Sequence, residues 1–268
     1  MVRSLAPGLH VGALLMSALL LAAPGAARAA DYAAVPGGTL ASVLSTPADK
    51  GPARIAPFQL RVTPVTNAEF EAFVGAHPEW QRGRAPSAFV DGQYLHAWAS
   101  AARPGPGLAP DAPVTAVSWF AAQAFCESEG GRLPTWAEWE YVAAADATHA
   151  DARKLPEWRA QILSWYSQSS AGALPAVGGP ANFYGVRNIH GLVWEWVDDF
   201  NALLVSADSR NQGDPDKLQF CGAGAISLQE KENYAILMRI ALLSSLSATG
   251  TTDNLGFRCA RSSPGESK

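Results

Sequence analysis

The fold of this chain is decided by Ala112-Pro-Val-Thr-Ala-Val-Ser-Trp119 and, shortly after it, Arg132-Leu-Pro-Thr-Trp-Ala-Glu-Trp-Glu-Tyr141. Thr135 and Glu138 have the spacing of a capping box. In such a box the threonine hydroxyl accepts a hydrogen bond from the N3 amide, and the glutamate accepts one from the threonine amide. A helix is therefore predicted to begin after Thr135 and to run to about Ala145.

A second helix is predicted just before this one. The hydroxyl of Ser118 is suited to the N-cap of the apolar run Trp119–Cys126. Gly130-Gly131 follows the run and can close the helix in a left-handed cap. The two helices would therefore be joined by a short turn.

Two further helices lie on either side of this block. Asn67 is expected to be the N-cap of a helix in which Phe70, Phe73 and Val74 share one face. Residues 232–243 form a weaker helical candidate near the end of the chain.

The segment from Asn188 to Val197 is interpreted as a turn that leads into a strand. Its alternation places Trp194 and Trp196 on one face and Glu195 on the other.

Composition extends this picture to the whole chain. The 268 residues are 48% hydrophobic and 16% charged, with 24 Gly and 19 Pro, which excludes a disordered chain and favours short elements joined by irregular loops. All nine Trp fall between Trp80 and Trp196, which indicates one continuous core. The net charge of −4 and the absence of a long Lys/Arg run argue against a nucleic-acid binder.

Residues 1–29 are predicted to be a secretory signal peptide. Arg3 gives the positive start, residues 11–23 form an uncharged apolar core, and Ala27-Arg28-Ala29 offers a small-x-small cleavage pattern. The rival interpretation is an uncleaved anchor. We expect residues 30–268 to be a single secreted or periplasmic domain with no further membrane span, at a net charge of −6 after the loss of two Arg and no acids.

Export changes how the three cysteines, Cys126, Cys221 and Cys259, are interpreted. In an oxidising compartment two of them should pair and one should be left over. Spacing alone does not choose the pair.

Most standard active sites are absent from the sequence. There is no His-Glu-x-x-His pattern, no phosphate-binding glycine loop and no Gly-x-Ser-x-Gly elbow, and the five His show no metal-ligand spacing. His190 is expected to be an ordinary hydrogen-bonded histidine at the surface.

Five segments, in order from about residue 35 to 262, together resemble the formylglycine-generating enzyme family, also called the sulfatase-modifying factor domain. They are Val35-Pro-Gly-Gly-Thr39, Val62-Thr-Pro-Val-Thr-Asn67, the block from Ala112 to Tyr141, Asn188-Ile-His-Gly-Leu-Val-Trp-Glu-Trp196 and Asn254-Leu-Gly-Phe-Arg-Cys259. In the block, Trp136 replaces a usual acid. The resemblance implies an α+β, formylglycine-generating-enzyme-like fold, related to C-type lectins, with little regular secondary structure.

The resemblance also implies chemistry that this chain departs from. Family members oxidise a peptide cysteine to formylglycine with copper and oxygen, using two cysteines about five residues apart. Glu230 and Ala235 stand roughly where that pair belongs, and neither is a thiolate ligand for copper. The His cluster of iron-dependent relatives is missing as well. We therefore expect a non-canonical member that makes no formylglycine, and whether it is an enzyme stays open.

Three other features are implied by the resemblance. The first is a disulfide between Cys126 and Cys259. The positions of a second family disulfide are occupied here by Ala143 and Ile240, so both of its cysteines are absent. The second is a structural calcium site. The third is a pocket, with Cys221 as a leftover thiol that is either a metal-binding or redox group or a small buried side chain. The expected calcium ligands are the side chains of Asn188 and Glu195 and the carbonyls of Gly191 and Val193, and the pocket residues are Trp194, Cys221 and Asn254.

The sequence therefore predicts an exported accessory or maturation factor that binds a metal or a protein partner, such as an envelope protein or metalloenzyme. One alternative is an oxidoreductase that uses Cys221 or an unrecognised metal, copper or iron. The other alternative is a lectin-like binding module.

Overall fold

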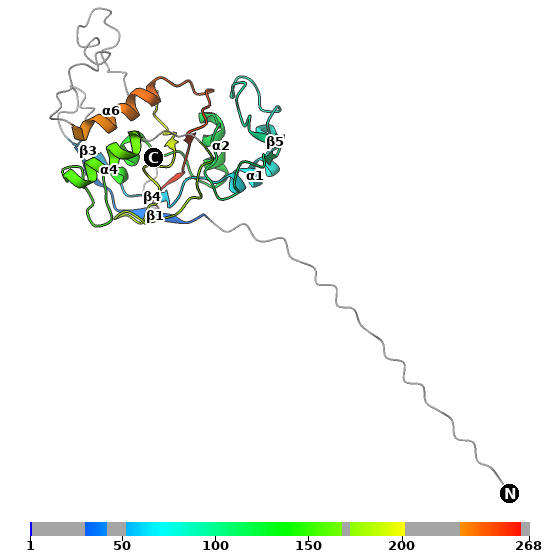
Figure 1. Ribbon diagram of the computed structural model, residues 1–268, viewed down its shortest axis with the longest axis horizontal. Helices are drawn as coiled ribbons and strands as arrows, with labels where there is room; N and C mark the ends of the chain where they lie inside the picture. Colours follow the sequence, from blue (N-terminus) through cyan, green and yellow to red (C-terminus); the bar gives the residue numbers. More distant parts are fainter. Residues whose placement is uncertain (2–29, 42–51, 168–171, 202–230, 264–268) are drawn as a thin grey trace, which may run out of the picture. The chain divides into compact units, whose positions relative to one another are not determined.

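The computed structural model describes residue 1 and residues 30–41, 52–167, 172–201 and 231–263 (Figure 1). The chain divides into Met1–Ala30 and a folded unit, Asp31–Lys268, which contains all the elements described below. The predicted signal peptide, Glu230 and Cys221 lie outside the described residues. None of the described helices is long and apolar enough to cross a membrane.

The strands are short and form four small sheets. The largest is antiparallel, in the order β1 (Tyr32–Val35), β4 (Phe58–Arg61) and β9 (Ala260–Ser262). Three pairs complete the set: β2 (Gly38–Leu40) with β3 (Ala53–Ile55), β5 (Trp98–Ser100) with β6 (Arg103–Pro104), and the parallel pair β7 (Trp194–Glu195) with β8 (Leu255–Gly256). The expected α+β fold with little regular secondary structure is confirmed.

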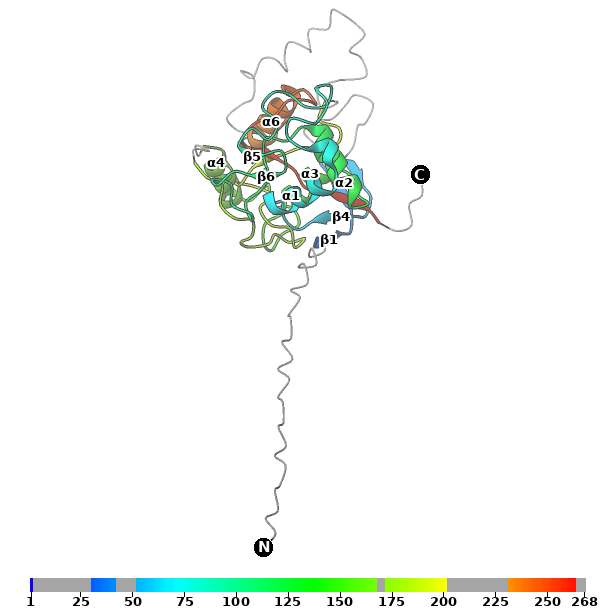
Figure 2. The same ribbon diagram turned by 90° about the vertical axis from the view of Figure 1, so that its right-hand side faces the viewer.

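In Figure 2 the helices lie above β1 and β4, which are at the lower edge of the fold. They are α1 (Asn67–Ala76), the 3-10 turn η1 (Pro78–Trp80), α2 (Trp119–Ser128), α3 (Trp136–Ala143), α4 (Pro156–Ser167) and α6 (Lys231–Ser244). In Figure 1, α1 and α2 lie on one side of the fold and α4 and α6 on the other. The four predicted helices are all present, whereas α4 was not predicted.

The caps of α2 and α3 are those predicted. Ser118 accepts from the amide of Ala121, and Thr135 and Glu138 form the capping box of α3. At the end of α2, Gly130 has a φ of 71° and the amide of Gly131 donates to the carbonyl of Cys126 at 2.8 Å. This is the left-handed closure that the glycine pair indicates.

The predicted cap of α1 is wrong by one residue. Thr66, with an extended backbone, is the N-cap and forms a capping box with Glu69. Asn67 is already helical, and its buried side-chain amide donates to the carbonyl of Ala109 at 2.9 Å. The competing Thr66–Glu69 signal wins because a capping box supplies two bonds and an asparagine cap only one. The apolar face of α1 is confirmed, since Phe70, Phe73 and Val74 are buried.

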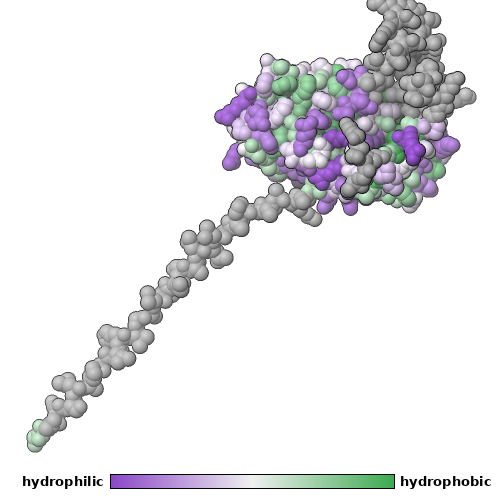
Figure 3. Space-filling model, turned by 180° about the vertical axis from the view of Figure 1, so that it is seen from behind, coloured by the Kyte–Doolittle hydropathy of each residue, from purple (hydrophilic) through white to green (hydrophobic). Residues whose placement is uncertain are grey.

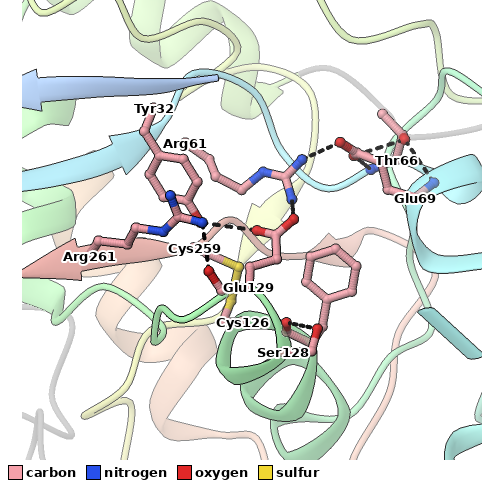
Figure 4. A network of polar contacts seen from close by, with 10 residues as sticks. Tyr32, Arg61, Thr66, Glu69, Cys126, Ser128, Glu129, Cys259 and Arg261 are labelled. Atoms are coloured by element: carbon pink, nitrogen blue, oxygen red, sulfur yellow. Dashed lines mark hydrogen bonds and ion pairs between the residues drawn. A yellow bond between two sulfur atoms is a disulfide. The ribbon is translucent and has the colours of Figure 1, made fainter. Parts of the chain in front are cut away.

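A disulfide and a buried ion network join α2 to the main sheet (Figure 4). Cys126 and Cys259 form the predicted disulfide, 133 residues apart in the sequence. Beside it, the buried Arg61 pairs with both Glu69 and Glu129, and the latter pair is 2.9 Å apart. Closing so long a loop stabilises the fold by about 2–5 kcal/mol.

The core is continuous, with one satellite under α4. The rings of Phe70, Phe125 and Phe257 pack together in the main core. Trp158 and Ile162 of α4 pack with Ala152 and Ala235 in the satellite, where α4 meets α6. On the face shown in Figure 3, hydrophilic and apolar residues are interspersed.

Candidate functional site

A cavity of about 300 Å³ lies between α3, α4, α6 and the loop that precedes β7. The wall is unusually aromatic and also contains charged groups. Its principal side chains are Trp136, Trp139, Glu140, Trp165, Tyr166, His190, Trp194, Glu195, Arg239 and Asn254.

The structure brings together two of the three predicted pocket residues. Trp194 and Asn254 both line the cavity, and the amide of Trp194 donates to the carbonyl of Asn254 at 2.8 Å. Cys221, the third, lies outside the described residues. Trp194 and Asn254 are therefore neighbours in the cavity wall, and the role predicted for them stays a prediction.

An ion pair that sequence reasoning missed forms one wall. Nε and an Nη of Arg239, on α6, donate to the two carboxylate oxygens of Glu140 on α3 at 2.7 and 2.6 Å. The other Nη donates to the hydroxyl of Tyr166 on α4 at 2.5 Å. The guanidinium carbon also lies 5.0 Å from the centre of a Trp139 ring. Burial alone would lower the pKa of Arg239, but Glu140 and Tyr166 raise it above its ordinary value, so the charge is fixed.

His190 is half-buried and packed among aromatic rings, more enclosed than the surface histidine that was expected. Its ring is stacked on Trp165 at 5.7 Å and meets the rings of Trp139 and Trp158 edge to face. Nε2 lies 2.7 Å from the carbonyl oxygen of Ala143, which can only accept, so Nε2 carries the proton. Burial, with a smaller contribution from Arg239, lowers the pKa of His190 to about 3. The prediction failed because the enclosing tryptophans come from α3 and α4, which the local sequence does not reveal.

Two buried polar atoms of the cavity wall are left without partners. With Nε2 protonated, Nδ1 of His190 is an acceptor, and it finds no hydrogen-bond partner among the described residues. Nε1 of Trp136, on a side chain only 5% exposed, is a donor that also lacks one there. Buried polar groups are usually satisfied, so two such atoms in residues of the same cavity call for a ligand or ordered water. The sequence showed that Trp136 replaces a usual acid of the family, but it did not show that the indole Nε1 would be buried without a partner.

The expected calcium ligands do not form a cation cage. Glu195 is buried, and its carboxylate accepts from Nε1 of Trp139 at 2.7 Å and from Arg258 at 2.7 and 2.8 Å. Oδ1 of Asn188 accepts from the amide of Gly178 at 2.7 Å. Among the described residues, no group of three or more His, Cys, Asp or Glu could hold a metal ion.

Arg258 contributes the positive charge in this region. Its second Nη, besides bonding Glu195, donates to the carbonyls of Arg187 and Asn188 at 3.1 and 3.2 Å. The carboxylate expected to face calcium is thus already neutralised by a guanidinium. Gly191 and Val193, whose carbonyls were the other expected ligands, line the cavity instead. As they are arranged, these four residues do not fit a calcium ion, since binding would require Glu195 to leave Arg258.

The position expected for a copper cysteine also does not fit a metal. Ala235 lies in α6, is 4% exposed and packs in the satellite cluster with Trp158 and Ile162. Its methyl group offers no ligand atom. Arg239, one helical turn later, is bound in its ion pair with Glu140 and offers no soft ligand for copper.

Comparison with known proteins places the chain in context. The family model described as "Sulfatase-modifying factor enzyme 1-like domain" matches residues 20–263. The chain is 30% identical to the formylglycine-generating enzyme of Streptomyces coelicolor over 251 residues, covering 77% of this chain and 79% of that protein. It is 28% identical to the inactive C-alpha-formylglycine-generating enzyme 2 of Mus musculus, covering 80% of this chain and 79% of that protein.

Other similarities are partial or remote. The alignment with the formylglycine-generating enzyme of Bos taurus is 31% identical and covers 44% of that protein, so the chain spans less than half of it. The solved structure of PvdO from Pseudomonas aeruginosa is similar at a TM-score of 0.44 and 18% identity, covering 86% of this chain and 94% of that chain.

Proposed function

The chain belongs to the sulfatase-modifying factor enzyme 1-like domain family, and from this premise we propose that it is a binding member of the family rather than a formylglycine oxidase. In this proposal it acts as an exported accessory or maturation factor whose partner engages the aromatic cavity. The observation that carries the proposal is α6, which places Arg239 in the cavity wall and buries Ala235 in the satellite cluster, so that neither residue offers a thiolate.

The copper chemistry of an oxidase has no support at this helix. Cu(I) is bound by soft thiolate ligands, and oxidation of a peptide cysteine through such a site needs both of them. Ala235 has no sulfur, and Arg239, which is held in its pair with Glu140, offers no soft ligand either. The same family contains the protein named inactive in Mus musculus, so a member without this activity has a precedent among the relatives.

The titratable groups of the cavity also favour binding over acid–base catalysis. General acids and bases work best with a pKa near the operating pH. The pKa of His190 is lowered to about 3, so this ring is neutral near pH 7. Glu140 and Glu195 are held by Arg239 and Arg258 in buried ion pairs. What the cavity offers is aromatic surface and fixed hydrogen-bonding groups.

The predicted signal peptide leads us to propose an envelope location and an envelope protein or metalloenzyme as the partner. Calcium at Asn188, Gly191, Val193 and Glu195 stays a prediction of the resemblance. Its binding there requires the Glu195–Arg258 pair to open.

The proposal is tested with a sulfatase-type Cys-x-Pro-x-Arg peptide, supplied with copper and oxygen. The Streptomyces coelicolor relative serves as the positive control, and aldehyde is detected by mass spectrometry after hydrazine labelling. We expect no aldehyde above the rate of a no-enzyme control. Appreciable aldehyde formation by the mature protein would falsify the proposal.

A lectin-like binding module is the second candidate. The aromatic wall of the cavity favours it, since ligand sites are commonly lined by aromatic side chains with a few polar groups that fix orientation. It shares the cavity with the first candidate and differs only in what enters it.

A further inference from the structure

We infer that the group that enters this cavity is an uncharged, hydroxyl-bearing ring, that is, a neutral saccharide unit. The inference rests on the proposed function in one respect only, namely that the cavity binds a ligand. It is argued from the charges, the unpaired hydrogen-bonding atoms and the aromatic wall, in that order.

The charges of the wall are already matched. Glu140 is paired with Arg239, and Glu195 with Arg258, at 2.6–2.7 Å and with every one of these side chains at most 6% exposed. A charged ligand entering the cavity would lose its hydration and, among the wall residues that the structure describes, find no unpaired opposite charge, which is costly in a buried site. The pairing therefore selects against both anions and cations.

An aromatic wall can also bind a quaternary ammonium group, but here the guanidinium of Arg239 already lies against two of the aromatic rings. The Arg239 guanidinium lies 5.0 Å from a Trp139 ring centre and 5.8 Å from that of Tyr166. Those rings already bind an internal cation. A second cation beside the first would be repelled.

The unsatisfied atoms call for a group that both donates and accepts. Nδ1 of His190 is an acceptor and Nε1 of Trp136 is a donor, and neither has a partner among the described residues. The Tyr166 hydroxyl accepts from Arg239, which leaves its proton to donate. A hydroxyl is the smallest neutral group that can serve both kinds of atom, and a saccharide carries several of them.

The remaining wall suits the apolar face of such a ring. Trp165 and Trp194 are half-buried members of the wall, and Tyr166, whose ring already contacts Arg239, stacks on Trp194 at 5.0 Å. Aromatic side chains provide large rigid apolar surface, and a polar edge where one is needed. The volume of about 300 Å³ is small for a ligand site, and it fits one ring with part of a neighbour better than a chain of residues.

The test uses sugars that share a ring and differ in charge. Glucose and N-acetylglucosamine are titrated into the mature protein beside glucosamine, which is cationic, and glucuronate, which is anionic. Binding is followed by tryptophan fluorescence and by saturation-transfer NMR. We expect saturable binding of at least one neutral sugar, and binding at least ten-fold weaker for its charged counterparts.

Three variants locate the site. His190→Phe removes the acceptor and keeps an aromatic ring, and Trp136→Phe removes the donor. Each is expected to weaken the binding of the neutral sugar about ten-fold or more, while near-UV circular dichroism verifies that the variant is folded. The matched control is Trp80→Phe, because Trp80 is half-buried but does not line the cavity, and it should leave the affinity unchanged.

The outcomes separate this inference from the proposed function. Equal or tighter binding of a charged sugar overturns the inference, as does unchanged affinity in both folded cavity variants. If none of the four sugars binds, or if only uncharged peptides bind, the saccharide assignment is wrong and the binding role of the cavity still stands. Formylglycine formation alone would overturn that role.

Discussion

Glu195 and Arg258 form a doubly hydrogen-bonded ion pair, with N–O distances of 2.7 and 2.8 Å, in which neither side chain is exposed to solvent. Trp139 donates a third bond to the same carboxylate, and Arg258 also reaches the carbonyls of Arg61 and Arg187. The pair thus connects the loop before β7, the end of β4 and the closing segment of the chain.

The first prediction concerns this pair. Arg258→Met should lower the free energy of unfolding by about 3–5 kcal/mol, because it leaves the Glu195 carboxylate buried without its partner. The matched control is Arg153→Met, which also breaks an ion pair but leaves the half-exposed Asp151 in contact with water, so its loss of stability should be clearly smaller. Urea denaturation of both variants measures the difference, and equal losses would contradict the role given to Arg258.

The second prediction concerns calcium. Because the Glu195 carboxylate is occupied by Arg258 and Trp139, we expect no change in melting temperature when the mature protein is moved from 1 mM EGTA to calcium. Differential scanning calorimetry at constant ionic strength checks this. A rise of several degrees with calcium would mean that the pair opens and that the resemblance predicted the cation site correctly.

The third prediction concerns pH. The pKa of His190 falls from an ordinary 6.5 to about 3 in the folded protein. Between these values the unfolded chain binds a proton that the folded chain does not, so stability is lost as the pH falls through this window, by up to about 1.4 kcal/mol per pH unit from this group.

His190→Gln isolates this contribution. Other acids titrate in the variant and in the parent protein alike, so the difference between the two unfolding curves belongs to His190. We expect the variant to lose less stability than the parent between pH 6.5 and pH 4 in urea denaturation. Parallel curves would show that the ring titrates normally in the folded state.

The fourth prediction concerns the cysteines. Since Cys126 and Cys259 are bonded, the denatured but unreduced mature protein should show one reactive thiol per chain, from Cys221. Ellman's reagent before and after reduction measures this. Cys126→Ser should cost about 2–5 kcal/mol of stability, whereas Cys221→Ser should leave the disulfide intact. Three thiols without reductant would refute the bond.

Much of the fold could be predicted because its signals are local. The Thr135–Glu138 capping box spans four residues, and Gly130-Gly131 directly follows the helix that it ends. The disulfide was expected from the family resemblance, not from spacing. The cap of α1 was misassigned because Thr66 and Asn67 are both good caps, and only the position of Glu69 decides between them.

The site was less predictable because its partners are distant in the sequence. Glu140 on α3 and Arg239 on α6 are 99 residues apart in the sequence, so no local pattern indicates that they pair. α4 has weak signals, with only Trp158 and Ile162 buried. The environment of His190 likewise comes from tryptophans on α3 and α4, which no local pattern around residue 190 reveals.

The Cys126–Cys259 bond has a consequence for proteolysis. Every principal residue of the cavity wall, from Trp136 to Asn254, lies inside the 133-residue interval that this bond closes. The interval is therefore a covalent ring, and a protease that cuts it once opens the ring without releasing a fragment. The two pieces stay tethered through sulfur, and cleaved protein would migrate as one species until a reductant is added.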